Sequence, residues 1–180
     1  ATTPHLFGQR PALHNTPYVV IPRVSSERRN YYAVRHVGPE VIASDATFTA
    51  ADTDGYLFAI ISSSMFMAWQ RAVGGRLKSD LRFSNTIVWN NLPLPKLNAS
   101  LRAEIANAGH DVVAARAGLS TLTLAQMYSG TELDGRLQRA HDKLDALVDR
   151  AFGAASLCTS EQERGTLLFA RLANLQDRPH

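Results

Sequence analysis

A short proline-containing segment, Leu92-Pro-Leu-Pro-Lys-Leu97, divides this chain into two stretches of different pattern. Proline lacks a backbone donor and fixes φ, so the segment suits neither a sheet interior nor the start of a helix. Before it, short β-branched runs alternate with turn residues; after it, apolar residues recur at helical spacing. We therefore expect an α+β chain, with a mixed α/β domain over residues 1–97 and a small all-α helical domain over 98–180.

The predicted elements follow from local pattern. Strands are expected where β-branched and aromatic residues cluster between turn signals, and helices where apolar residues lie on one stripe. Asp54 can cap the first helix, which ends at Gly74-Gly75. The expected strands cover 18–24, 31–37, 41–49 and 77–83, and helical spacing is expected over 54–73, 101–113 and 137–151. Ser160 with Glu163 resembles a capping box, and a last helix is expected to carry Leu167, Leu168, Leu172 and Leu175.

Composition indicates a folded chain in a reducing compartment. The 180 residues are 45% hydrophobic and 19% charged, and no apolar run is long enough to span a bilayer. A single cysteine, Cys158, excludes an internal disulfide, and no signal peptide opens the sequence. We expect a cytoplasmic protein with no membrane partner. Because no Met begins the sequence, we also expect a piece of a longer polypeptide.

The basic residues are concentrated in the first half. Residues 1–97 hold ten Lys and Arg against six Asp and Glu, whereas 98–180 hold nine against ten. Eight of the first ten bases are arginine, which suits bidentate contact with phosphate and guanine. This asymmetry favours a polyanionic partner for the first half.

Motifs for catalysis and metal binding are missing, so we expect no catalytic residue and no metal site. Gly74-Gly75 has neither Walker nor Rossmann spacing, and the six histidines are scattered singly. His141 lies on an apolar helical stripe and is expected to pack in the core rather than act as a ligand or base. Cys158 is expected to be an inert small side chain.

The segment Gly75–Ser84 alternates apolar and charged residues. On a single strand, Lys78, Asp80 and Arg82 would point the same way at intervals of about 6.8 Å. Lysine and arginine donate to guanine, and aspartate accepts from cytosine N4, so such a trio could read base edges in a major groove. The alternative is a solvated strand face with neighbouring ion pairs, which is common on half-buried strands.

Several motifs in series resemble the target-recognition and C-terminal domains of MmeI-like type IIL restriction–modification enzymes and related adenine methyltransferases. The resemblance covers roughly Tyr18 to Leu175. It rests on Pro22-Arg-Val-Ser-Ser-Glu-Arg-Arg29, Val41-Ile-Ala-Ser-Asp45, Met67-Ala-Trp69, Val73-Gly-Gly-Arg-Leu-Lys-Ser-Asp80, Arg82-Phe-Ser84, Trp89-Asn-Asn-Leu-Pro-Leu-Pro95, Leu124-Ala-Gln-Met-Tyr128, Ala140-His141, Leu144-Asp145 and Phe152-Gly153.

The resemblance implies recognition of a double-stranded DNA sequence through the major groove, beside an S-adenosylmethionine-dependent methyltransferase that modifies adenine N6. It places base-reading positions at Lys78, Asp80 and Arg82, with a further one near Ala46. The methyltransferase domain, its cofactor and any Mg-dependent nuclease would lie upstream, so this chain itself would hold no cofactor.

Phosphate contacts are expected from arginines that flank turns, where they add charge without sequence information. These are Arg28, Arg29 and Arg76; for Arg28-Arg29 a simple solvated turn is an equal alternative. A competing interpretation of the whole chain is a protein–protein docking module of a larger enzyme, using the acidic C-terminal helices and making no DNA contact. Independent catalysis is disfavoured because the required motifs are missing.

Overall fold

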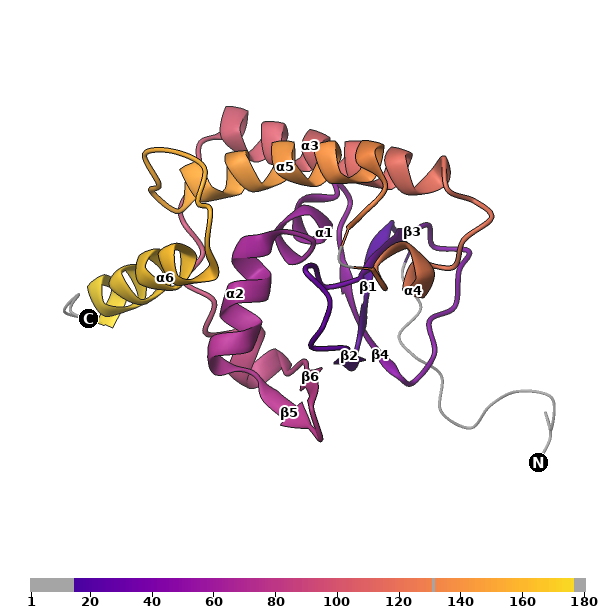
Figure 1. The fold of residues 1–180 in the computed structure, drawn as a ribbon, viewed down its shortest axis with the longest axis horizontal. Coiled ribbons are helices and arrows are strands. Elements are labelled where there is room, and N and C mark those ends of the chain that lie inside the picture. The colour runs from indigo at the N-terminus through magenta and orange to yellow at the C-terminus, as the bar shows by residue number, and fades with distance from the viewer. Residues whose placement is uncertain (1–14, 131, 177–180) are drawn as a thin grey trace.

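The structure, a computed structural model, describes residues 15–130 and 132–176, and it is an α+β fold as predicted. Among the described residues, two small antiparallel sheets, two α-helices and a π-helix belong to the first half, and four α-helices follow the proline segment (Figure 1). None of the helices among the described residues is both long and apolar enough to cross a membrane.

The first sheet has the strand order β3-β1-β4, with β1 at Tyr18–Pro22, β3 at Arg35–Val37 and β4 at Thr47–Ala51. The predicted strand over 31–37 is therefore too long. Residues 31–34 are all buried, without the alternation that a half-exposed strand would show. This stretch enters the core instead, where the Tyr32 hydroxyl donates to the Pro22 carbonyl over 2.9 Å.

The second sheet corrects the prediction of one long strand over 77–83. It has the order β2-β6-β5, formed by β2 (Val24–Ser25), β5 (Gly75–Leu77) and β6 (Asp80–Arg82). Strands β5 and β6 form a hairpin in which Leu77 pairs with Asp80 across a two-residue turn. Lys78 in that turn has φ 56°, in the left-handed region that reverses the chain.

The predicted helix over 54–73 is two helices, α1 (Tyr56–Ile61) and α2 (Ser64–Val73). Ser63 has extended backbone angles, and its side chain accepts a hydrogen bond from the Phe66 N–H, which makes it the N-cap of α2. After β6, a π-helix at Asn85–Trp89 leads into the proline segment.

Helices α3 (Ala99–Ala117) and α5 (Gly135–Ala151) lie side by side, and α3 also packs on α1 (Figure 1). Gly109 allows the close approach of α3 to α1, because a Cβ there would lie 2.7 Å from the Cβ of Ala59. One apolar core draws residues from both halves. The short helix α4 (Leu124–Met127) connects α3 to α5, and α6 (Glu161–Gln176) packs on α2.

A buried ion pair attaches α6 to the end of α5. Asp149 is fully buried, and the Nε and Nη2 atoms of Arg164 each donate to one of its carboxylate oxygens over 2.9 Å. The Cys158 N–H donates to the same carboxylate, also over 2.9 Å. The loop between the two helices is therefore held by charge-assisted hydrogen bonds at both of its ends.

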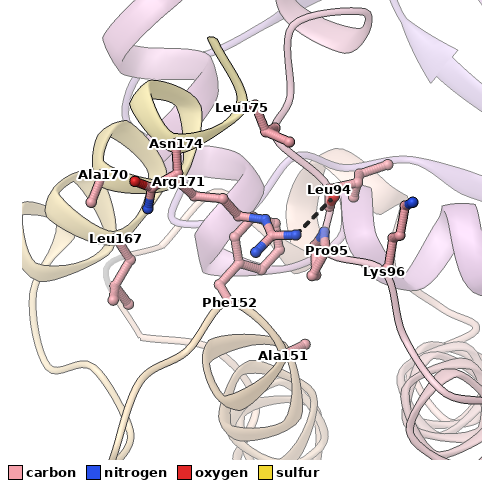
Figure 2. Close-up of a pocket in the computed structure, with 10 residues that line it drawn as sticks. All are labelled: Leu94, Pro95, Lys96, Ala151, Phe152, Leu167, Ala170, Arg171, Asn174 and Leu175. Atoms are coloured by element: carbon pink, nitrogen blue, oxygen red, sulfur yellow. Dashed lines mark hydrogen bonds between the residues drawn. The ribbon is translucent and has the colours of Figure 1, made fainter. Parts of the chain in front are cut away.

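Helix α6 also contacts the proline segment. The Arg171 side chain donates from Nε to the Pro93 carbonyl over 2.8 Å and from Nη2 to the Leu94 carbonyl over 3.4 Å. Figure 2 shows this side chain reaching across a cavity of about 490 Å³ between α6, Phe152 and the proline segment.

Buried polar side chains join the two halves. Asp145 on α5 accepts from the Ser64 N–H (2.8 Å), the Ser64 hydroxyl (2.6 Å) and the Tyr31 hydroxyl (3.1 Å). His141, one turn earlier, is fully buried as predicted and stacks on Tyr31 with ring centroids 3.7 Å apart. Across 81 positions of sequence, α5 thus supplies the partners of the first turn of α2.

The imidazole of His141 is held neutral by its neighbours. Arg116 Nε donates to the Tyr128 hydroxyl (2.8 Å), and this hydroxyl is also hydrogen-bonded to His141 Nε2, 2.6 Å away. Burial, and then the nearby Arg116 charge, lowers the pKa of His141 to about 3. Burial raises the pKa of Asp145 to about 6.

These two shifts have opposite effects on stability in acid. As the pH falls from about 6.5 towards 3, His141 binds a proton in the unfolded state but stays neutral in the folded state, and this difference destabilises the fold. Between about pH 6 and 4, the folded state binds a proton at Asp145 before the unfolded state does, which stabilises the fold.

We therefore expect Asp145→Asn to make the acid-induced loss of stability steeper, by up to about 1.4 kcal/mol per pH unit in this window. Asparagine keeps an acceptor for the Ser64 N–H, so the variant should fold at neutral pH. Urea unfolding of both proteins at several pH values between about 7 and 4 measures the difference. Parallel pH profiles would show that Asp145 does not take up a proton in this range.

Candidate nucleic-acid interface

The β5–β6 hairpin projects from the end of α2 at one edge of the molecule (Figure 1). Arg23, between β1 and β2, connects the two sheets beside this hairpin. Its N–H donates to the Ala46 carbonyl over 3.0 Å, and its own carbonyl accepts from the Phe83 N–H over 3.0 Å. The backbone thus places Ala46 on one side of Arg23 and the end of β6 on the other.

Three arginines surround a hollow of about 300 Å³ on this face, and none of the described residues that line it is acidic. The Arg23 guanidinium lies over the Phe48 ring, 4.8 Å from its centroid, which restricts the side chain without neutralising it. Ile87 on the π-helix is exposed at the rim. The lining residues are Arg23, Phe48, Gly75, Arg76, Arg82, Phe83, Ser84 and Ile87.

The expected base-reading residues occupy two different settings. Asp80 and Arg82 lie on the same face of β6, opposite the fully buried Leu81, so the spacing expected for a strand holds for this pair. Lys78 is instead at the exposed tip of the hairpin turn, so the arrangement of all three in line on one strand is wrong. Ala46 is exposed and joins this surface through Arg23.

The expected phosphate-binding arginines lie beside the hairpin. Arg76 Nη1 pairs with Glu27 over 2.9 Å and also donates to the Ser79 carbonyl over 3.1 Å, which braces the turn. The Glu27 pair brings the turn that carries Arg28 and Arg29 next to the hairpin. Arg28 is exposed there, and the Arg29 carbonyl accepts from Arg71 Nη2 over 2.9 Å.

Sequence reasoning did not single out Arg23. Arg23 lies between Pro22 and strand β2, and nothing in this local sequence indicates that it links the two sheets. The only local signal was the proline, which predicts an edge or a bulge.

Elsewhere, Cys158 is buried, and burial raises the pKa of its thiol to about 11, so at neutral pH it is a thiol rather than a thiolate. Among the residues that the structure describes, no three His, Cys, Asp or Glu side chains form a group that could hold a metal ion.

The sequence and fold identify the class of protein. Residues 1–96 match the model of the MmeI target recognition domain, and residues 98–178 match that of the MmeI C-terminal domain. The chain belongs to the MmeI family.

Two individual proteins are similar to this chain over most of its length. DNA methyltransferase A of Bacillus subtilis (strain 168) is 35% identical over 169 residues, which are 93% of this chain and 19% of the relative. A solved structure of the type IIL restriction-modification enzyme MmeI in complex with DNA has a TM-score of 0.85 and 31% identity, over 93% of this chain and 22% of that one. The chain thus spans about a fifth of the length of each.

Proposed function

We propose that this chain recognises a specific sequence in double-stranded DNA, with the β2–β6–β5 sheet facing the major groove. The observation that carries the proposal is the hollow bordered by Arg23, Arg76 and Arg82, next to which Asp80 shares the face of β6 with Arg82 and Lys78 stands in the hairpin turn. Arginines around one hollow, one of them held on an aromatic ring, are suited to guanine edges and phosphates.

Lys78 supports the same proposal. A lysine at φ 56° occupies a position where glycine or asparagine would cost less, since a left-handed residue with a side chain loses about 1–2 kcal/mol. Its side chain stands at the tip of the hairpin, where it can enter a groove that the sheet itself only borders. We assign base reading to Lys78, Asp80, Arg82 and the Ala46 position, and phosphate contacts to Arg28, Arg29 and Arg76.

The proposal extends to a larger enzyme, supported by the name of the Bacillus subtilis relative and by the subject of the MmeI structure. The recognition unit, residues 1–97, and the helical unit, 98–180, would serve an upstream methyltransferase domain that uses S-adenosylmethionine to methylate adenine N6. A fused nuclease would add Mg. The proposed location is the cytoplasm, where bacterial DNA lies.

Fluorescence anisotropy on a mixed-sequence duplex across a salt series tests DNA binding. Each phosphate contact contributes about 0.9 to the slope of log K against log salt. We expect Arg28→Ala/Arg76→Ala, at two of the proposed phosphate contacts, to weaken binding and to flatten this slope by up to about two. The matched control, Arg136→Ala/Arg139→Ala, removes two exposed arginines from α5 and should leave affinity and slope unchanged. Equal effects of the two double variants would refute a DNA face on this sheet.

The second candidate is a protein–protein docking module, and the cavity beside α6 favours it (Figure 2). That cavity is lined by Leu94, Phe152 and Leu167, and the exposed Leu175 stands at its edge. Binding through such an apolar surface would be nearly independent of salt, whereas the DNA contact would weaken steeply.

A further inference from the structure

A second cavity, of about 510 Å³, lies between β3, the end of α3 and α4. The ribbon places β3 and α4 away from the β5–β6 hairpin (Figure 1). Its walls are partly apolar, with Val37, Val113 and Met127, and its rim carries the exposed Leu122. The two charged side chains in its lining are both arginines, Arg35 and Arg116, and no described lining residue is acidic.

Arg116 is a buried cation with an unused donor. It is 9% exposed, and it donates from Nη1 to the Val34 carbonyl over 2.7 Å and from Nε to the Tyr128 hydroxyl. Among residues 15–130 and 132–176, its Nη2 atom is buried without a hydrogen-bond partner. A buried donor of this kind costs free energy unless a partner reaches it.

The partners that Arg116 does have leave its charge uncompensated. The Val34 carbonyl and the Tyr128 hydroxyl are neutral, and the rings of Phe58 and Tyr128 lie 5.2 and 5.0 Å from the guanidinium carbon. Burial, opposed by Tyr128 and reinforced by the nearby Arg35, lowers the pKa of Arg116. The aromatic faces attract the cation but supply no anion.

We propose that this cavity binds a carboxylate carried on an apolar body, with the guanidinium groups of Arg116 and Arg35, two of its lining residues, as the donors. A single negative charge matches the one buried cation, and guanidinium geometry suits a planar carboxylate. The apolar walls accept the hydrocarbon attached to the carboxylate. A phosphate ion is strongly hydrated and would gain nothing from these walls. The bearer is either a free carboxylic acid or an acidic side chain between apolar residues.

Thermal unfolding of this chain with hexanoate, at constant ionic strength, tests the proposal independently of DNA. We expect a saturable rise of about 2–4 °C in Tm at about five times Kd. Hexanol and inorganic phosphate are the comparison ligands, and neither should give this rise. An equal rise with hexanol would reduce the site to an apolar groove, and a larger one with phosphate would overturn the carboxylate assignment.

Two variants locate the effect. Ala117→Trp places a bulky group in the cavity from an exposed position and should abolish the hexanoate shift; Arg35→Ala should raise the Kd about two- to fivefold. Both leave the Arg116 hydrogen bonds in place, so the chain should still fold. An unchanged shift in both variants would overturn the proposal.

A peptide comparison identifies the bearer of the carboxylate. If a capped Leu-Glu-Leu peptide binds more tightly than hexanoate, the bearer is an acidic side chain; if hexanoate binds more tightly, the bearer is a free acid. Either result supports the site.

Discussion

Arg164→Met should lower the free energy of unfolding by about 3–5 kcal/mol. The substitution keeps most of the apolar stem of the side chain but removes the two guanidinium donors of Asp149, which is fully buried at the end of α5 and keeps only the Cys158 N–H as a donor. An uncompensated carboxylate then remains in the core, where its desolvation is no longer offset. Urea unfolding at neutral pH measures the loss.

An exposed ion pair provides the matched control. Arg150 and Glu104 also connect two helices, at 2.7 Å, but both side chains are about half exposed. Arg150→Met should therefore cost less than about 1 kcal/mol. Adding Asp149→Leu to Arg164→Met should recover part of the loss, because the buried charge disappears although the Cys158 N–H loses its acceptor. Equal losses for Arg164→Met and Arg150→Met would contradict the role given to the buried pair.

Reversing the charges of the hairpin, as Lys78→Asp with Asp80→Lys, should change the preferred base pair at one position of the sequence recognised by the whole enzyme. Lysine donates to guanine and aspartate accepts from cytosine, so the exchange inverts the donor and acceptor pattern offered to a G·C pair. Each good base contact discriminates by about 1–3 kcal/mol, enough to redirect most modification. Sequencing of the modified sites measures the preference.

The control for this exchange reverses a pair elsewhere. Lys143 and Asp111 form an exposed ion pair of 2.7 Å between α5 and α3, and exchanging them conserves the net charge in the same way. The modified sequence should then stay the same. If the hairpin exchange also left it unchanged, Lys78 and Asp80 would not be base-reading residues.

The sequence predicted those elements whose stability depends on local pattern. Strand β1 and the helices α3, α5 and α6 lie where the apolar periodicity placed them, because each buries one regular face. The proline segment does separate the sheets from the long helices, and the family motifs identified the class of protein.

Two features were not predicted from the sequence: one depends on a distant partner and the other on a turn of unusual composition. The helix over 54–73 is interrupted at Ser63, the N-cap of α2, where Asp145 also supplies acceptors for the Ser64 N–H and hydroxyl, and no local signal announces this partner 81 positions away. The hairpin was missed because its turn is Lys78-Ser79, without the glycine or asparagine that normally marks a two-residue turn. Alternation of polar and apolar residues is the same for one long strand and for two short strands, so it could not separate them.

The β5–β6 hairpin is held in the core by few of its residues, and this affects how its preference for a DNA sequence could change in evolution. Of the residues in β5, its turn and β6, Leu81 alone is fully buried, while Lys78 and Arg82 are exposed. Substitutions at Arg82, and at Lys78 by residues that tolerate its left-handed backbone, therefore cost little folding free energy. With the recognition role proposed for them, new sequence preferences would be reachable one mutation at a time, without a destabilised ancestor in between. Such a recognition surface is evolvable because the fold does not depend on its contents.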